Sequence, residues 1–287
     1  MVKSRRDASL RARIVDIAPL TGVRAGSAVV FCDGRLLLIQ DDAHEAVWVD
    51  PRSRALERIA LEGSGERLPK PKKPDFEAAF VGPGRAVTIL GSGSAASRRR
   101  AVCIHLDDGA VRHHDCGGIF DALTARLGAS PNVEGAILAG DVLRLFHRGA
   151  GPIPSAVVDV PAAAIEGGEA SILAFTLHDL GHAAGVPLHF TDAVTLGALS
   201  LYLAVAEDTP NAIDDGPIAG AAVGLIEGES ARFAILEEPD GRPTARKVEG
   251  IAIDPSSGET WLVTDPDDPD RPAELCRLAL EGFGETK

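Results

Sequence analysis

The chain has 287 residues, of which 45% are hydrophobic and 25% are charged, and its formal net charge is -13 at pH 7. This negative charge argues against binding to nucleic acid or to an anionic membrane through bulk electrostatics, but it is compatible with a bound cation. The composition is ordinary for a globular protein, and no low-complexity linker divides the chain. We therefore expect a single domain over residues 11–282, with flexible termini at 1–10 and 283–287.

The N-terminal twenty residues are basic but contain no continuous apolar segment, and nowhere in the chain do eighteen apolar residues run together. We therefore expect a soluble, cytoplasmic protein. The four cysteines lack a CxxC pair and fall mostly within predicted strands, which favours buried free thiols over disulfides or zinc ligands.

In chain order, the first predicted element is a strand at 13–18, which has no local partner. Short apolar runs broken by glycine and proline turns then predict groups of strands. The predicted strands are 28–31, 36–40, 46–50 and 56–61; then a run from 77 through 87 to 90, followed by 101–106 and 111–116; then 133–138, 142–146, 156–160 and 172–177; then 193–196, 200–204, 221–226 and 232–237; and finally 248–253, 260–264 and 274–280. A helical spacing of apolar residues at 119–127, followed by Gly128, predicts one helix.

Each group begins with one short pattern: a residue with an oxygen-bearing side chain lies near the start of an apolar run, and the run ends in a turn. The five positions are Ser27, Glu77, Glu134, Asp192 and Glu249. Their spacings are 50 (77−27), 57 (134−77), 58 (192−134) and 57 (249−192) residues. A fixed period near fifty in a sequence of short strands is typical of a β-propeller.

The predicted fold is therefore all-β: a five-bladed propeller of four-stranded antiparallel blades. The last group has three strands of its own, so the N-terminal strand at 13–18 is expected to supply its fourth strand and close the ring.

In a propeller the first strand of each blade lines the axial channel, so the five equivalent side chains should form a ring. Four carboxylates only a few Å apart repel one another at roughly 4 kcal/mol per close pair, which favours protonation or a shared cation. Calcium accepts six to eight oxygen ligands in loose geometry and is the first choice, with magnesium second. The alternative is that these acids cap backbone groups between blades, or hold a metal that only pins the blades together.

The ring of Ser, Glu, Glu, Asp and Glu resembles that of the calcium-activated nucleotidases, or soluble apyrases, and the hexad KVEGIA at 247–252 is similar to blade openings in phytase-like bacterial propellers. The resemblance implies a central calcium held by one residue from each blade. By that likeness the five ring positions would be the metal ligands, with Asp192 standing where the family pattern leads us to expect serine.

The loops after the second strands should form the rim of the same face. They offer Asp41, His147 and Glu207 as candidate general bases. Arg98, Arg99, Arg100 and Arg148 are candidate ligands for a phosphate or carboxylate substrate, because forked guanidinium groups bind oxyanions through two hydrogen bonds. For Arg98 and Arg100, the alternative is that their side chains point to solvent.

These features leave three classes of function. The first is a metal-dependent hydrolase of phosphate esters or anhydrides that acts on a small anionic substrate. The second is a non-catalytic propeller with a structural metal, which binds a partner protein or a small anion. A carbohydrate-directed propeller is the third, and it is disfavoured because aromatic residues make up only 4% of the chain. The sequence does not indicate the oligomeric state.

Overall fold

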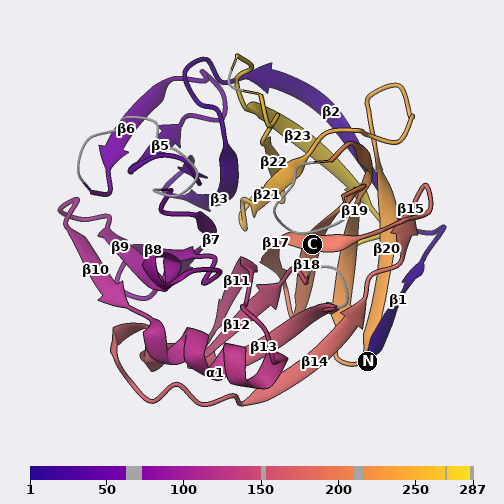
Figure 1. Cartoon of the computed structure of the whole chain (residues 1–287). Helices are drawn as coiled ribbons and strands as arrows, with labels where there is room; N and C mark the ends of the chain where they lie inside the picture. Colours follow the sequence, from indigo (N-terminus) through magenta and orange to yellow (C-terminus); the bar gives the residue numbers. More distant parts are fainter. Residues whose placement is uncertain (63–72, 150–152, 210–215, 269, 285–287) are drawn as a thin grey trace.

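A computed structural model describes residues 1–62, 73–149, 153–209, 216–268 and 270–284. Strand pairing divides the chain into five four-stranded antiparallel sheets arranged around one axis, as Figure 1 shows. The predicted all-β propeller is therefore confirmed.

The five sheets are consecutive along the chain, apart from one strand. The first contains β3 (Gly26–Cys32), β4 (Arg35–Gln40), β5 (Glu45–Val49) and β6 (Leu56–Ala60). The second contains β7 (Phe76–Gly82), β8 (Ala86–Gly91), β9 (Arg100–His105) and β10 (Val111–Asp115). The third contains β11 (Val133–Ala139), β12 (Val142–His147), β13 (Ser155–Pro161) and β14 (Ala174–Asp179). The fourth contains β17 (His189–Leu196), β18 (Leu199–Glu207), β19 (Ile218–Glu227) and β20 (Ser230–Glu237).

The fifth sheet is built from both ends of the chain. It contains β21 (Val248–Ile253), β22 (Thr260–Thr264), β23 (Glu274–Glu281) and β2 (Arg11–Pro19). The strand β2 pairs antiparallel with β23 along its whole length, which closes the ring as predicted. The inner strands β3, β7, β11, β17 and β21 each contact the next one, and β21 contacts β3.

Small elements fill the connections between blades. The predicted helix is present as α1 (Gly117–Leu127), which ends at Gly128 in the left-handed conformation (φ 71°). Short 3-10 turns form at Ala96–Arg98 and Ala162–Glu166, and a two-stranded ribbon forms from β15 (His182–Ala183) and β16 (Val186–Pro187). The four cysteines are buried and unpaired.

The N-terminus differs from the expected flexible segment. The strand β1 (Val2–Arg6) pairs in parallel with β14 through Val2 and Lys3, and with β20 through Ser4–Arg6. It therefore bridges the outer edges of the third and fourth blades. At the other end, Phe283 is only 2% exposed and belongs to an apolar cluster, while residues 285–287 lie outside the described part of the chain.

The apolar core is divided among the blade interfaces. In the described chain, each of five apolar clusters lies between two adjacent blades, and together they cover every boundary of the ring. Alternating strand residues produce this arrangement, because the two faces of each blade are buried against its two neighbours. The inner strands are thereby fixed around the axis, with their first residues at one mouth of the channel.

Candidate metal centre at the axial mouth

A β-bulge near the start of every inner strand marks equivalent positions. In each strand the pairing register skips one residue, which the ladder leaves unpaired. The skipped residues are Ser27, Glu77, Glu134, Thr191 and Glu249.

The bulge corrects the predicted ring in the fourth blade, where Thr191 and not Asp192 is the equivalent residue. The register skips between Phe190 and Asp192, so Asp192 is paired in the ladder. Its buried carboxylate accepts hydrogen bonds from the N–H of Ala193 at 2.7 Å and of Ile251 at 2.8 Å. Asp192 therefore caps backbone groups between the fourth and fifth blades, which is the alternative role considered for the acids.

The two hydroxyl residues of the ring also link neighbouring blades. Ser27 Oγ donates to the carbonyl of Phe76 at 2.5 Å, and Thr191 Oγ1 donates to the carbonyl of Val248 at 2.9 Å. In both cases the acceptor directly precedes the ring glutamate of the next blade. These hydroxyls help to position Glu77 and Glu249.

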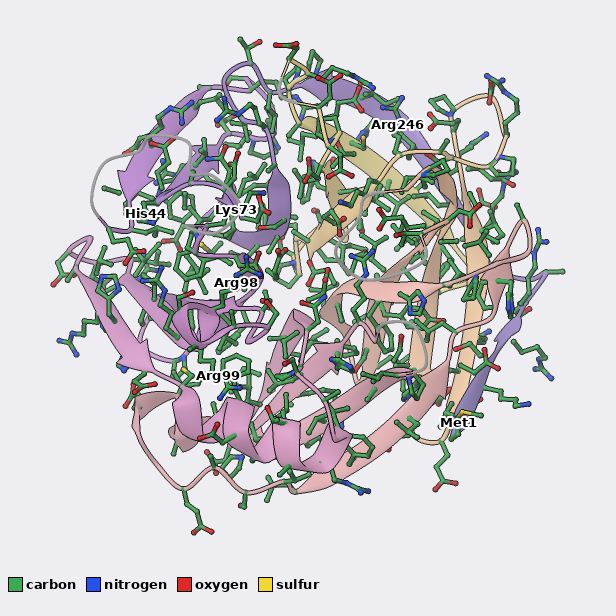
Figure 2. The ribbon with its side chains drawn as sticks, in the orientation of Figure 1. Met1, His44, Lys73, Arg98, Arg99 and Arg246 are labelled. Atoms are coloured by element: carbon green, nitrogen blue, oxygen red, sulfur yellow. The ribbon has the colours of Figure 1, made fainter. Side chains whose placement is uncertain are left out.

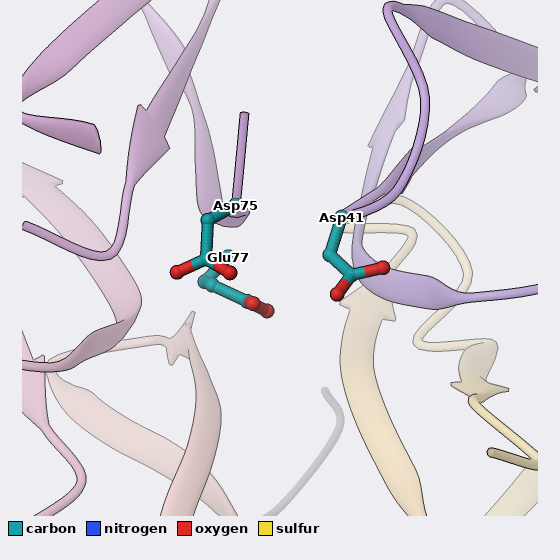
Figure 3. Close-up of side chains that lie close together, drawn as sticks. All are labelled: Asp41, Asp75 and Glu77. Carbon is teal, nitrogen blue, oxygen red and sulfur yellow. The ribbon is translucent and has the colours of Figure 1, made fainter. Parts of the chain in front are cut away.

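Glu77 lies in a cluster of acids at the boundary between the first and second blades. One carboxylate oxygen from each of Asp41, Asp75 and Glu77 lies within 4.8 Å of the other two. Figure 3 shows Asp75 and Glu77 side by side, with the Asp41 side chain opposite them. Within the described residues, the Glu77 carboxylate accepts no hydrogen bond and forms no ion pair.

The environment of Glu77 disfavours its charge. Burial, followed by the nearby Asp75, Glu134, Asp41 and Glu249 carboxylates, raises the pKa of Glu77 well above its usual range. A cation among these oxygens would reverse this effect, because it would favour the ionised form.

Asp75 is held firmly in the acidic cluster. Its φ of 56° is left-handed, a conformation that aspartate tolerates better than most residues. Its carboxylate accepts hydrogen bonds from the hydroxyls of Ser92 and Ser94, and it pairs with Arg98 at 2.9 Å. The N–H of Asp75 also donates to the carbonyl of Asp41 at 3.2 Å, which ties the two blades together beside the cluster.

Asp41 retains one oxygen for a ligand. Its Oδ2 pairs with Lys73 Nζ at 2.7 Å, whereas its Oδ1 is buried without a hydrogen-bond partner in the described chain. Burial raises the pKa of Asp41, although Lys73 opposes the shift. Asp41 was predicted as a general base, and the structure places it within the acidic cluster.

The opposite side of the ring carries its own cation. Arg148 Nη1 lies 3.4 Å from both carboxylate oxygens of Glu134, and Nη2 lies 2.6 Å from Glu207 Oε2. Glu134 also accepts a hydrogen bond from Asn132 Nδ2 at 2.6 Å. The surrounding glutamates raise the pKa of Arg148 despite its burial, so the guanidinium stays charged.

Glu249 is only partly compensated. Lys247 Nζ lies 3.6 Å from Oε1, but Oε2 is buried without a partner among the described residues. Burial raises the pKa of Glu249 to about 8, although Lys247 and Arg148 act in the opposite direction. The unpaired oxygen of this 5% exposed residue is a second indication that the ring is built around a ligand.

Protein groups already contact the other two candidate bases, although His147 Nε2 is buried without a partner in the described chain. His147 is 1% exposed, and its Nδ1 accepts a hydrogen bond from the N–H of Asn132 at 2.9 Å. Burial lowers the pKa of His147 to about 4, so its imidazole is neutral at pH 7. Glu207 accepts from Arg148 and from the N–H of Gly216 at 2.9 Å. Both residues therefore help to position groups that contact Glu134: His147 bonds to Asn132, and Glu207 pairs with Arg148.

The four candidate arginines lie in different parts of the structure. Arg98 reaches the acidic cluster, and Arg148 lies within the ring. Arg99 pairs with Asp121 on α1 at 2.6 Å, and Figure 2 shows it farther from the axis than Arg98. Arg100 forms two hydrogen bonds with Glu62, at 2.7 and 2.5 Å. Arg99 and Arg100 therefore do not join Arg98 at the channel mouth.

Several site residues were missed by the sequence analysis. Asp75, Asn132, Lys247 and His189, whose Nδ1 lies 3.1 Å from the carbonyl oxygen of Arg148, each lie two residues before a ring position. Their signal is a repeated polar residue at that spacing, which is visible only once the ring positions are fixed. Lys73 was missed for another reason, since it pairs with Asp41 across a loop and carries no pattern of its own.

The far end of the channel has a different chemistry. A cavity of about 170 Å³ is lined by a triplet from each inner strand: 29–31, 79–81, 136–138, 193–195 and 251–253. Each triplet begins two residues after a bulged residue, which independently supports Thr191 as the fourth ring member. Apart from Thr195, the side chains of these triplets are apolar, so the polar chemistry is confined to the acidic mouth.

Comparison with family models places the chain in a known group. The model of the DUF6929 family, described as a family of unknown function, matches residues 22–280. The chain belongs to the DUF6929 family. A search of curated proteins found no match to this DUF6929 chain.

Solved structures share the fold of the DUF6929 chain. A glutaminyl cyclase from Myxococcus xanthus is similar with a TM-score of 0.57 and 11% identity, covering 98% of each chain. The allergen Mala s 1 from Malassezia sympodialis gives a TM-score of 0.55 at 10% identity, covering 88% of this chain and 92% of the allergen. A PQQ-bound aldose sugar dehydrogenase from Streptomyces coelicolor gives 0.53 at 13%, covering 96% and 100%. At such low identity these likenesses show the propeller-like fold alone.

One feature of the described chain bears on membranes. Among the described residues of this DUF6929 protein, none of the helices combines the length and the apolar character needed to cross a bilayer.

Proposed function

We propose that the protein binds a divalent cation at the axial mouth, through Asp41, Asp75 and Glu77. The observation that carries this proposal is the proximity of three carboxylate oxygens, all within 4.8 Å of one another, around a Glu77 side chain to which no described residue donates a hydrogen bond. One oxygen of Asp41 and one of Glu249, both buried and without a partner in the described part of the chain, also support it. A divalent ion would offset the mutual repulsion of these acids and complete their coordination.

Calcium is the ion we propose first, with magnesium second. The cluster offers only carboxylate oxygens, and hard divalent cations prefer these ligands to the nitrogen and sulfur ligands of zinc sites. Calcium tolerates irregular geometry, which suits ligands from two loops and one strand of two different blades. The resemblance of the repeats to the calcium-activated nucleotidases stays a prediction and points to the same ion.

We extend the proposal to metal-dependent hydrolysis of a small phosphate ester or anhydride. The bound cation would polarise a phosphoryl oxygen and lower the pKa of a water molecule. Arg98 and Lys73 lie beside the acids and would supply positive charge toward an anionic substrate. Asp41, the candidate base that lies within the cluster, would act here as a metal ligand, because its Oδ2 pairs with Lys73 and only Oδ1 has no partner among the described residues.

A structural metal is the second candidate function, and one contact favours it. The backbone hydrogen bond from Asp75 to Asp41 joins the first and second blades beside the cluster, so an ion bound there would also hold these blades together. If the metal is structural, the propeller face would bind a partner protein or a small anion without catalysis.

Calorimetric titration tests the metal site. We expect wild-type protein to bind a single calcium ion, and Glu77→Gln to weaken binding at least about tenfold, because it removes a ligand charge without changing side-chain size. The matched control is Glu57→Gln, since Glu57 lies on the outer strand β6 and its side chain is 70% exposed. Wild-type protein that binds neither calcium nor magnesium would refute the proposal.

A panel of nucleotide and aryl phosphates, assayed with calcium, magnesium or a chelator, distinguishes a metal-dependent hydrolase from a propeller with a structural metal. Turnover that requires the metal and falls in Glu77→Gln and Asp41→Asn supports the hydrolase. Calcium binding without turnover of any substrate in the panel supports the structural metal.

A further inference from the structure

Glu77 differs from the other ring glutamates in its ion pairs. On the side of the third to fifth blades, Glu134 and Glu207 share Arg148, and Glu249 lies 3.6 Å from Lys247. On the side of the first and second blades, Lys73 and Arg98 pair with Asp41 and Asp75, whereas Glu77 has no ion-pair partner in the described chain. Protein cations therefore contact Glu134 and Glu249 directly, but not Glu77.

Arg148 occupies its position through several fixed contacts. It follows the last residue of β12, its N–H donates to the carbonyl of Asn132 at 2.9 Å, and its side chain is 17% exposed. The guanidinium fork spans two acids from different blades, Glu134 and Glu207. Movement of the Arg148 side chain toward solvent is disfavoured, because it would leave the buried carboxylates of Glu134 and Glu207 without their ion-pair partner.

We infer that Arg148 is a resident cation that excludes the metal from the Glu134 side of the ring and sets its position off the axis. This inference rests on the proposed metal site and specifies where in the ring that site can form. A guanidinium and a divalent cation cannot share Glu134, because their charges would repel within a few Å in a partly buried site. The ion is left with the carboxylates of the first and second blades, and Arg148 acts as a positioning residue.

The test compares calcium binding by Arg148→Met with that of the wild type, using calorimetry and equilibrium dialysis with calcium alone. In the wild type, Asp41→Asn should weaken binding at least about tenfold, whereas Glu134→Gln should have a much smaller effect. In Arg148→Met we expect additional calcium uptake, and Glu134→Gln introduced into that variant should abolish the added uptake. Arg99→Met is the matched control, because Arg99 pairs with Asp121 on α1 and should not change the stoichiometry.

Arg148→Met leaves the buried acids Glu134 and Glu207 without their ion-pair partner, so a second variant is needed in case this one does not fold. Arg148→Gln combined with Glu207→Gln removes one acid together with the arginine and leaves the Glu134 carboxylate available to calcium. Calcium should raise the melting temperature of this double variant more than that of the wild type, and Arg148→Lys, which keeps the charge, should show no added uptake.

The outcomes distinguish the two proposals. If removal of Arg148 adds no calcium uptake in either variant, or if Glu134→Gln abolishes binding in the wild type, the inference about Arg148 is wrong. If wild-type protein takes up no calcium but the variants do, Arg148 is a resident cation and the proposed function of the wild-type site fails.

Discussion

The hydroxyl of Thr191 donates a hydrogen bond at 2.9 Å to the carbonyl of Val248, across the boundary between the fourth and fifth blades. The hydroxyl of Ser27 makes the same contact with Phe76 at the boundary between the first and second blades. In both cases a ring residue holds the backbone that precedes the next ring glutamate. The two neutral members of the ring thus help to position two of its three acidic members, Glu77 and Glu249.

Thr191→Val should destabilise the protein by about 1 to 2 kcal/mol, because it leaves the buried carbonyl of Val248 without its donor while preserving side-chain shape. Urea unfolding of the chelated protein measures this loss. Thr195→Val, at an exposed position of the same strand, should change the free energy of unfolding by less than about 0.5 kcal/mol. Equal losses in the two variants would contradict the role assigned to Thr191.

Asp192→Ala should cost more, roughly 3 kcal/mol, because two buried N–H groups lose their acceptor. The isosteric Asp192→Asn keeps one acceptor oxygen and should be less damaging. Calcium stoichiometry in Asp192→Asn should match that of the wild type, since the carboxylate is engaged by the backbone. Loss of calcium from a folded Asp192→Asn protein would instead restore Asp192 as a ligand.

The sequence was sufficient to predict the fold because its information is local and repeated. The last blade was predicted at 248–253, 260–264 and 274–280, and the structure has strands at Val248–Ile253, Thr260–Thr264 and Glu274–Glu281. Each strand is an apolar run between turn residues, so its position needs no long-range contact. The strand without a local partner, at 13–18, similarly indicated the closure that β2 provides.

The fourth ring position was wrong because a bulge interrupts the alternation on which strand patterns depend. Thr191 and Asp192 are adjacent polar residues, and a shift of one residue moves a side chain to the other face of the strand. Spacing alone could not choose between them, since 57 (191−134) and 58 (192−134) both fit the repeat. The register of hydrogen bonds decides the question.

Contacts between distant segments were the other part that the sequence did not reveal. The parallel pairs of β1 with β14 and β20 join segments far apart in the chain, and no local pattern identifies such partners. The same applies to the arginines, which looked alike in sequence. Arg98 faces Asp75 while Arg99 faces Asp121, because the short turn at Ala96–Arg98 directs successive side chains apart.

Removal of the metal should lower thermal stability. At a calcium concentration one hundred times the dissociation constant, binding contributes about 2.7 kcal/mol, so chelation should lower the melting temperature by roughly 5 to 10 °C. A calcium titration followed by differential scanning fluorimetry measures the shift. Glu77→Gln should show little calcium-dependent shift, and a full shift in that variant would place the ion elsewhere.

Acid should destabilise the protein partly through His147. Burial lowers the pKa of His147 to about 4, below the ordinary value of 6.5, so the folded state keeps this ring neutral while the unfolded chain takes up a proton. Between pH 6.5 and pH 4 the unfolded state therefore binds more protons, and the contribution of His147 to stability decreases as the pH falls. Below about pH 4 both states are protonated and this contribution stops changing.

His147→Gln tests the acid effect, since the amide oxygen can accept from the N–H of Asn132 and does not titrate. Urea unfolding at several pH values should show that this variant loses up to roughly 3 kcal/mol less than the wild type between pH 6.5 and pH 4. His178→Gln should remove a similar part of the pH dependence, because burial lowers the pKa of His178 to about 4 as well. An unchanged pH dependence in His147→Gln would mean that the imidazole is accessible to protons in the folded state, and His147 would again be a candidate for proton transfer at the channel mouth.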